Sequence, residues 1–283
     1  MPEFLTLQEM IARHVPDGAA VALEGFTHLI PFAAGHELIR QRRRELHLIR
    51  MTPDLVYDKL IGMGAARRLT FSWGGNPGVG SLHRLRDAVE HGWPRPLELD
   101  EHSHAGMAAA WRAGAARLPF GMLRGYAGTD LPAHNPRIRT VRCPYTGEEL
   151  ATVPALNPDV TILHAQRADR AGNVAITGII GAQREAAFAA TKLLVSVEEI
   201  VNELPPAMNG VLLPQFIVTA IALVPGGAWP SYAQGLYARD NDFYQRWDAI
   251  ARDRARFTAW MERHVLGSAD HRGFLASLRA EPA

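Results

Sequence analysis

The sequence has 283 residues, 47% of them hydrophobic, and a globular chain of this size buries roughly three quarters of its unfolded surface. Its 30 lysines and arginines nearly balance 29 acidic residues. This excludes the basic field that would attract nucleic acid or an anionic membrane surface.

A single cysteine, Cys143, excludes an internal disulfide and favours a reducing compartment. No apolar run is long enough to span a membrane, and Met1 to Phe4 does not resemble the start of a signal peptide. We therefore expect a cytoplasmic protein without membrane association. Lys59 and Lys192 are the only lysines, and neither has sequence neighbours that mark it as a nucleophile.

Strand and helix signals alternate through the first 92 residues. The capping-box pattern from Thr6 to Glu9 predicts a helix to about Val15. We expect further helices at 31–40, 53–63 and 81–92, and strands at 19–23, 46–51 and 69–73. Because strands that alternate with helices pair in parallel, the pattern predicts an α/β fold with an open, mostly parallel sheet and helices on both faces.

The second part of the chain continues this alternation around an insertion. We expect strands at 97–104, 160–164, 174–177, 193–197 and 217–224, and helices at 105–116 and 182–190. Residues 118–136 are rich in glycine and proline and predict a loop or lid, and 139–153 predict a β-hairpin. A long helix carries Phe243 to Met261. We interpret 1–267 as one domain with an insertion at 118–153, and 268–283 as a polar tail.

The segment from Leu69 to Gly92 is typical of a ligand-binding turn. A strand runs into the loop Gly74-Gly75-Asn76-Pro77-Gly78-Val79-Gly80, and a helix follows. Glycines let a backbone approach a ligand, and free N–H groups at a helix start favour phosphate or carboxylate. The segment does not match the dinucleotide-binding fingerprint, because His83 replaces the third glycine. It does not match the phosphate-binding loop either, because the lysine of that motif is missing. The alternative is a plain loop at the sheet edge.

Two further places combine polar residues with a strand end. On a strand, Asp100, His102 and His104 would share one side, but three ligands on one strand seldom converge, so no metal site is predicted. Glu101 and Ser103 would share the other side, where the carboxylate can act as a base; the alternative is a strand end hydrogen-bonded into loops. At Glu24-Gly25-Phe26, the glycine N–H can face an oxyanion, or the segment is a simple tight turn.

Four segments together resemble the A chain of class I CoA-transferases, and the glutaconate type is the nearest branch. The likeness covers nearly the whole chain to about Gly267. The segments are Val21 to Thr27, Trp73 to Gly80, Asp159 to Gln166 and Val224 to Ala228.

The resemblance implies an open α/β sheet and an active site shared between an A and a B chain. It implies that a glutamate of the B chain attacks succinyl-CoA, passes through an anhydride to a glutamyl-CoA thioester, and hands CoA to 3-oxoadipate. The CoA thioester is then a substrate, and no cofactor is expected. No nucleophile motif is found in this chain, so no catalytic residue is assigned to it.

The resemblance also implies which residues of this chain bind substrate or CoA. Gly25 and Phe26 would shape the thioester pocket, while Asn76 and Gly78 would line the channel that Glu101 and Ser103 face. The full set of expected binding residues is Glu24, Gly25, Phe26, Thr27, Asn76, Gly78, Gly80, Glu101 and Ser103.

Glu24 departs from this family pattern, because relatives commonly have two glycines before the phenylalanine. The carboxylate would repel the wrong acyl acid or pair with His28. Other functions stay open: transfer to another dicarboxylic acid, a CoA-ester hydrolase or decarboxylase with Glu101 as base, and a non-enzymatic sensor of acyl-CoA or a sugar phosphate.

Overall fold

The computed structural model describes residues 1–75, 80–204 and 209–280, and within these ranges its centre is an open sheet of ten strands. Eight of the strands follow one path, each parallel to its neighbours. Along that path the order is β1 (Glu3–Phe4), β13 (Val218–Leu223), β11 (Lys192–Val201), β9 (Val160–Asp169), β2 (Ala20–Glu24), β3 (Leu46–Ile49), β4 (Ala66–Phe71) and β5 (Glu98–Glu101). The predicted α/β sheet is confirmed.

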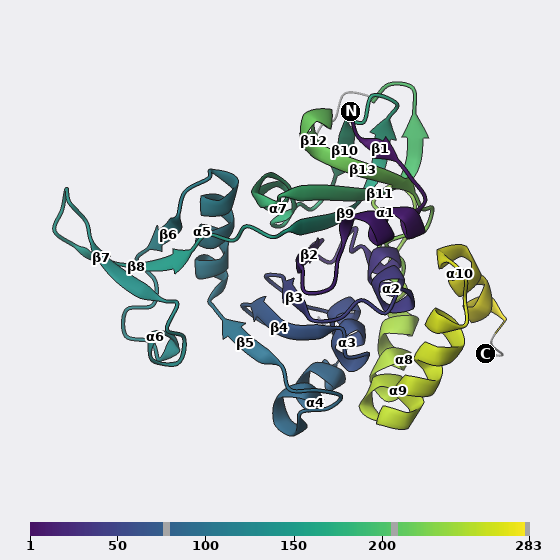
Figure 1. Ribbon diagram of the computed structural model, residues 1–283, viewed down its shortest axis with the longest axis horizontal. Coiled ribbons are helices and arrows are strands. Elements are labelled where there is room, and N and C mark those ends of the chain that lie inside the picture. Colours follow the sequence, from purple (N-terminus) through teal and green to yellow (C-terminus); the bar gives the residue numbers. More distant parts are fainter. Residues whose placement is uncertain (76–79, 205–208, 281–283) are drawn as a thin grey trace.

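Helices cover both faces of this sheet, as expected (Figure 1). Successive residues of a strand point to opposite faces: Leu23 of β2 joins the larger core, and Ala22 joins a smaller one. The larger core is covered by α1 (Leu7–His14), α2 (Phe32–Arg40), α3 (Leu55–Gly62), α4 (His83–His91) and the C-terminal helices, and the smaller one by α5 (His104–Ala115) and α7 (Gln183–Ala189).

Local signals set several helix ends where the sequence predicted them. At α1, the Thr6 hydroxyl accepts from the N–H of Glu9, and the Glu9 carboxylate accepts from the N–H of Thr6 at 3.0 Å, which is the predicted capping box. Gly92 ends α4 with a φ of +66°, a left-handed conformation that suits glycine.

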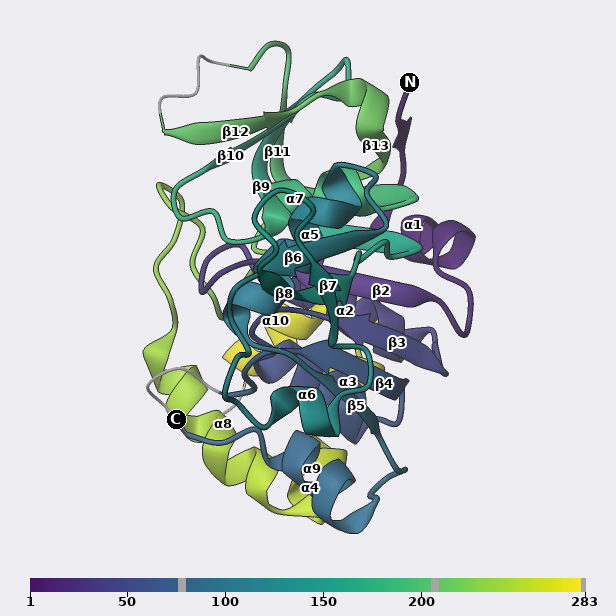
Figure 2. The same ribbon diagram turned by 90° about the vertical axis from the view of Figure 1, so that its left-hand side faces the viewer.

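Strands β9 and β11 are much longer than predicted, and β5 is much shorter. β9 and β11 each run for ten residues, and their far ends extend beyond the rest of the sheet (Figure 2). There β9 pairs with the expected strand β10 (Val174–Thr177), which in turn pairs with β12 (Gly210–Leu213), a strand that the sequence analysis did not predict. The strand expected to reach His104 ends at Glu101, because Ser103 caps α5.

The insertion at 118–153 forms an arm that projects from the body (Figure 1). Its hairpin, β7 (Arg139–Arg142) and β8 (Glu149–Pro154), is confirmed. The expected loop at 118–136 is only partly a loop, since it contains β6 (Phe120–Leu123), which pairs with β8, and the short helix α6 (Leu131–His134).

The C-terminal region is more helical than the sequence predicted. The single long helix is two, α8 (Asn241–Arg252) and α9 (Arg254–Trp260), because Asp253 accepts from the N–H of Arg256 and starts a new helix; a π-helical turn follows at 261–266. The expected polar tail contains α10 (His271–Arg279). Phe274 of α10 is fully buried in the larger core.

Lys59 of α3 lies where the C-terminal helices pack on the body of the protein, and its sequence neighbours gave no sign of this position. Its ammonium is fully buried, lies 3.1 Å from Nε2 of His36, and is surrounded by five aromatic rings with centroids at 4.5 to 5.9 Å. A cation over ring faces is attracted to them, while burial lowers its pKa to about 7. The rings are those of Phe32, Phe243, Trp247, Trp260 and Phe274.

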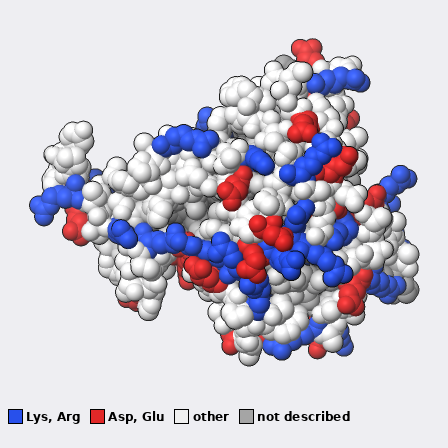
Figure 3. Space-filling view, viewed as in Figure 1, with Lys and Arg blue, Asp and Glu red and all other residues white. Residues whose placement is uncertain are grey.

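Charges of both signs alternate on the face of Figure 3, as expected from the near-neutral composition. Among the described residues, no helix is both long and apolar enough to cross a membrane.

We predict that Phe274→Ala destabilises the chain by about 3 kcal/mol or more, because it leaves a cavity in the core and removes one ring beside Lys59. Urea unfolding of the full chain measures this. Arg272→Ala, on the exposed side of the same helix, is the control and is expected to change stability by less than about 0.5 kcal/mol. A loss below about 1 kcal/mol for Phe274→Ala would show that α10 is not part of the core.

Candidate active site

A cavity of about 250 Å³ opens where β2, β3 and β4 end. The carboxyl ends of neighbouring parallel strands are the usual place for a binding site in open α/β sheets. Loops after the three strands supply most of its wall, and α5 and the segment before α8 complete it. Its lining residues are Gly25, Phe26, Thr27, Ile30, Arg50, Thr52, Asp54, Trp73, His104, Arg239 and Tyr244.

The turn after β2 is tightly folded around Gly25. A Cβ at this position would lie 2.7 Å from the carbonyl oxygen of Leu29 and 2.9 Å from that of His28, so only glycine fits. Thr27 and Leu29 have φ angles of +57° and +52°, which are unfavourable for residues with a Cβ. The surrounding structure must therefore hold this turn in place.

Arg50 is the buried residue that holds it. Its guanidinium donates to the carbonyl of Gly25 and to both carboxylate oxygens of Asp54, at 3.3 and 3.1 Å. Asp54 also accepts from the N–H of Val56 and so caps α3. One buried cation thus fixes the β2 turn to the start of the helix after β3. The sequence analysis did not identify Arg50, although a charged residue at a strand end was a usable signal.

Glu24 lies behind the cavity and does not line it. The residue is buried, and burial raises the pKa of its carboxyl to about 7 against the opposing charge of Arg50. Oε1 has no hydrogen-bond partner among the described residues. The hypothesis that Glu24 pairs with His28 is not supported, because the ring nitrogens of His28 lie 3.3 Å from the carbonyl of Ile179 and 3.0 Å from the N–H of Gln234.

The mouth of the cavity carries exposed aromatic side chains. Phe26 and Trp73 are 42% and 47% exposed. Elsewhere in the lining, the guanidinium of Arg239 lies 4.0 Å from the ring centroid of Tyr244. Trp73 belongs to a segment that carried the family resemblance, while Arg239 and Tyr244 were not predicted as site residues, because the segment before α8 reaches the cavity only through tertiary folding.

The other predicted site residues lie elsewhere. Asn76 and Gly78 are outside the described residues. Gly80 has a φ of +123° and lies against Asp248 of α8. Glu101 lines a different cavity, of about 260 Å³, together with Arg68 and Arg137.

The predicted grouping along the strand at Asp100 to His104 does not form, because the chain turns into α5. The Ser103 hydroxyl accepts from the N–H of Gly106 as a helix cap, and only His104 reaches the cavity at Gly25. Burial alone would raise the pKa of Asp100. Its pKa nevertheless lies below the usual range, because the carboxylate is stabilised by hydrogen bonding and charge from His102 and by hydrogen bonds from Asn135 and Thr70. In the described ranges no cluster of three potential metal-ligating side chains is present.

Comparison with known proteins places this geometry in a family. A sequence model of the coenzyme A transferase family matches residues 4–223. The chain is 62% identical to the A subunit of 3-oxoadipate CoA-transferase of Pseudomonas knackmussii over 278 residues, which cover 98% of this chain and 99% of that protein. The chain therefore belongs to the coenzyme A transferase family.

Solved structures agree with this assignment and confirm the resemblance to the glutaconate type. Glutaconate coenzyme A-transferase of Acidaminococcus fermentans superposes with a TM-score of 0.91 at 29% identity, over 98% of this chain and 93% of that one. A variant of the decarboxylase AibA/AibB superposes with a TM-score of 0.82 at 33% identity, over 93% of this chain and 99% of that one.

We predict that Glu24 makes the chain less stable as the pH rises. Because the pKa of its carboxyl is about 7 in the fold against an ordinary 4.5, the folded chain keeps a proton that the unfolded chain loses between these values. The free energy of unfolding then falls across this window, by on the order of 3 kcal/mol. In Glu24→Gln this part of the pH dependence is expected to disappear.

Urea unfolding at about pH 3.5 and about pH 8 measures the difference between wild type and variant, since these values bracket the two pKa values. Asp58, whose pKa burial also raises to about 7, contributes equally to both proteins and cancels. Glu203→Gln, at an exposed position, is the control for charge loss and should retain the wild-type slope. Identical slopes for wild type and Glu24→Gln would contradict the prediction.

Proposed function

We propose that this chain is the A subunit of a heteromeric CoA-transferase that moves CoA from succinyl-CoA to 3-oxoadipate. The observation that carries the proposal is the 62% identity, over nearly the full length of both chains, to a protein named as the A subunit of 3-oxoadipate CoA-transferase. The partner B subunit supplies the nucleophilic glutamate, which forms the glutamyl-CoA thioester. The reaction takes place in the cytoplasm and needs no cofactor beyond the CoA thioester substrate.

The cavity at Gly25 supports a site that is divided between two polypeptides. Its mouth is open, and the exposed rings of Phe26 and Trp73 border it. Large apolar side chains around a concave site are typical of a surface that another protein covers. Among the described residues that line the cavity, Asp54 is the only carboxylate, and it already binds Arg50. This supports a reactive carboxylate that comes from another polypeptide.

The cavity also suits a dicarboxylic acyl acceptor. Arg50 and Arg239 both line it, and guanidinium groups bind carboxylates with directed hydrogen bonds. Arg50 is occupied by Asp54 and Gly25, so its role is to shape the turn. Arg239 lines the same cavity, and we assign it the distal carboxylate of the acid. We place the thioester carbonyl against the part of the wall formed by Gly25 and Phe26.

A hydrolase or decarboxylase with Glu101 as its base is not proposed. Glu101 lines the cavity with Arg68 and Arg137, at the edge strand β5, and not the cavity at Gly25.

We predict that the chain alone has no CoA-transferase activity and that mixing it with its B subunit restores exchange between succinyl-CoA and 3-oxoadipate. The reason is that the nucleophile lies on the other polypeptide. Borohydride reduction during turnover should modify a glutamate of the B chain and none in this chain, as mass spectrometry would show. Exchange catalysed by this chain by itself would exclude the divided site.

We predict that Gly25→Ala lowers kcat/KM of the assembled enzyme at least about 100-fold, because the added methyl group collides with backbone atoms of residues 28–30 and displaces the turn. Steady-state kinetics for both substrates measure this. Gly125→Ala is the matched control: its Cβ would meet only the tip of Leu123, at 3.3 Å, away from the cavity. Wild-type kinetics for Gly25→Ala would remove the turn from the mechanism.

A further inference from the structure

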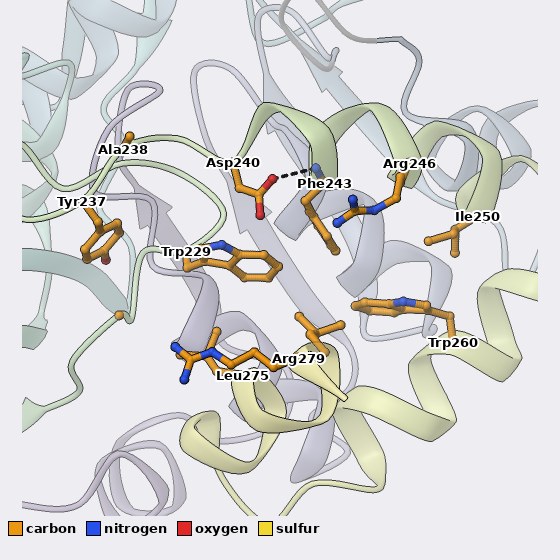
Figure 4. Close-up of a pocket in the computed structure, with 12 residues that line it drawn as sticks. Trp229, Tyr237, Ala238, Asp240, Phe243, Arg246, Ile250, Trp260, Leu275 and Arg279 are labelled. Carbon is orange, nitrogen blue, oxygen red and sulfur yellow. Dashed lines mark hydrogen bonds between the residues drawn. The ribbon is translucent and has the colours of Figure 1, made fainter. Parts of the chain in front are cut away.

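A second and larger cavity, of about 630 Å³, lies between the 226–240 segment and the C-terminal helices (Figure 4). The proposed transferase reaction does not use it. Its volume is in the range of sites that hold small organic ligands. Its lining residues are Gly226, Trp229, Tyr237, Ala238, Asp240, Phe243, Arg246, Ile250, Trp260, Leu275, Leu278 and Arg279.

The lining combines an apolar interior with two arginines. In Figure 4 the indole of Trp229 lies in the middle of the cavity, with Trp260 and Ile250 to its right. Arg246 extends from α8 and Arg279 from α10, on either side of the Trp229 ring. Neither arginine has a hydrogen bond or ion pair with another described residue. Two guanidinium groups without a partner in the described part of the chain, beside aromatic rings, suit an anion with an apolar body.

The one carboxylate in the described lining does not cancel this charge. Asp240 is the N-cap of α8, and its Oδ1 accepts from the N–H of Phe243 at 2.8 Å (Figure 4). Its position is thus set by the helix, and the lining keeps a net charge of one positive unit from the two arginines and this aspartate.

One wall of the cavity is held in place by a buried network. The carboxylate of Glu198 accepts from the N–H of Gly226 at 2.7 Å, from the hydroxyl of Tyr237, and lies 2.6 Å from Nε2 of His164. Both Gly226 and Tyr237 line the cavity. Because this wall is fixed from β9 and β11, the cavity is formed before any ligand enters, which lowers the entropic cost of binding.

We propose that this cavity binds an amphipathic organic anion, with an aromatic or branched aliphatic body against Trp229 and Trp260 and a carboxylate at the guanidinium group of Arg246 or of Arg279. It is a second small-molecule site, separate from the cavity at Gly25.

The two cavities share one segment, so an occupant of the second site acts on the first. Asp240 and Phe243 line the second cavity, while their neighbours Arg239 and Tyr244 line the first. Phe243 also packs against the Lys59 ammonium, at 5.3 Å. A ligand that shifts the start of α8 therefore moves the arginine to which we assign the acyl acid. This consequence rests on the proposed function, whereas binding itself does not.

Calorimetric titration of the full chain with 4-phenylbutyrate and with its neutral counterpart 4-phenylbutanol tests the proposal. We expect the acid to bind at least about tenfold more tightly than the alcohol, because only the acid pairs with the arginines. The double variant Arg246→Gln/Arg279→Gln should remove this preference. Arg272→Gln, an exposed residue of the same helix α10 outside the cavity, is the matched control and should retain it.

Three outcomes would overturn the proposal: no saturable binding of the acid at millimolar concentration, equal affinities for acid and alcohol, or loss of binding in Arg239→Gln but not in the double variant. The last would place the acid in the cavity at Gly25.

Coupling is measured separately, in the complex with the B subunit. There, 4-phenylbutyrate should change the KM for the acyl acid at least about twofold in the wild type and not in the double variant. An unchanged KM with intact binding would retain the site and remove its effect on the first cavity. An inactive complex would count against the proposed function alone.

Discussion

The buried guanidinium of Arg50 is the interaction on which the candidate active site depends. It joins the carbonyl of Gly25 at the end of β2 to the carboxylate of Asp54 at the start of α3. A turn with two non-glycine residues in the left-handed region needs such support from outside itself. The charge of Arg50 also partly offsets the rise that burial causes in the pKa of Glu24, the residue that departs from the family pattern. Charge, backbone geometry and cavity shape are thus set together.

The C-terminal helices contribute to the candidate active site as well as to stability. Their rings pack around Lys59 of α3, and the first turn of α8 brings Tyr244, with the preceding Arg239, to the wall of the first cavity. The second cavity is lined by Asp240 and Phe243, which lie between Arg239 and Tyr244 in the same segment. The segment from Arg239 to Tyr244 is therefore the physical link between the two sites.

Much of the fold was predictable because its signals are local. The capping box at Thr6, the glycine at position 92 and the strand–helix alternation depend on neighbours in sequence, and all are confirmed. The errors occurred where a long-range contact decides the outcome. The apparent tail contains a helix, whose Phe274 is buried in the larger core. Lys59 is an ordinary residue in sequence, and its aromatic surroundings come from α8, α9, α10 and the start of α2.

By itself, the sequence determined the fold class, the family and the turn Gly25-Phe26-Thr27 as a candidate binding segment, because glycine content, periodicity and family motifs are properties of contiguous residues. Only the tertiary structure decided that Glu101 and Ser103 do not line the cavity at Gly25: Glu101 lines another cavity beside the edge strand β5, and Ser103 caps α5. The tertiary structure also brought Arg50, Arg239 and Tyr244 into the lining of the cavity at Gly25. These residues meet only because parallel strands and the returning C-terminal segment end at the same edge of the sheet, and no local pattern encodes that meeting.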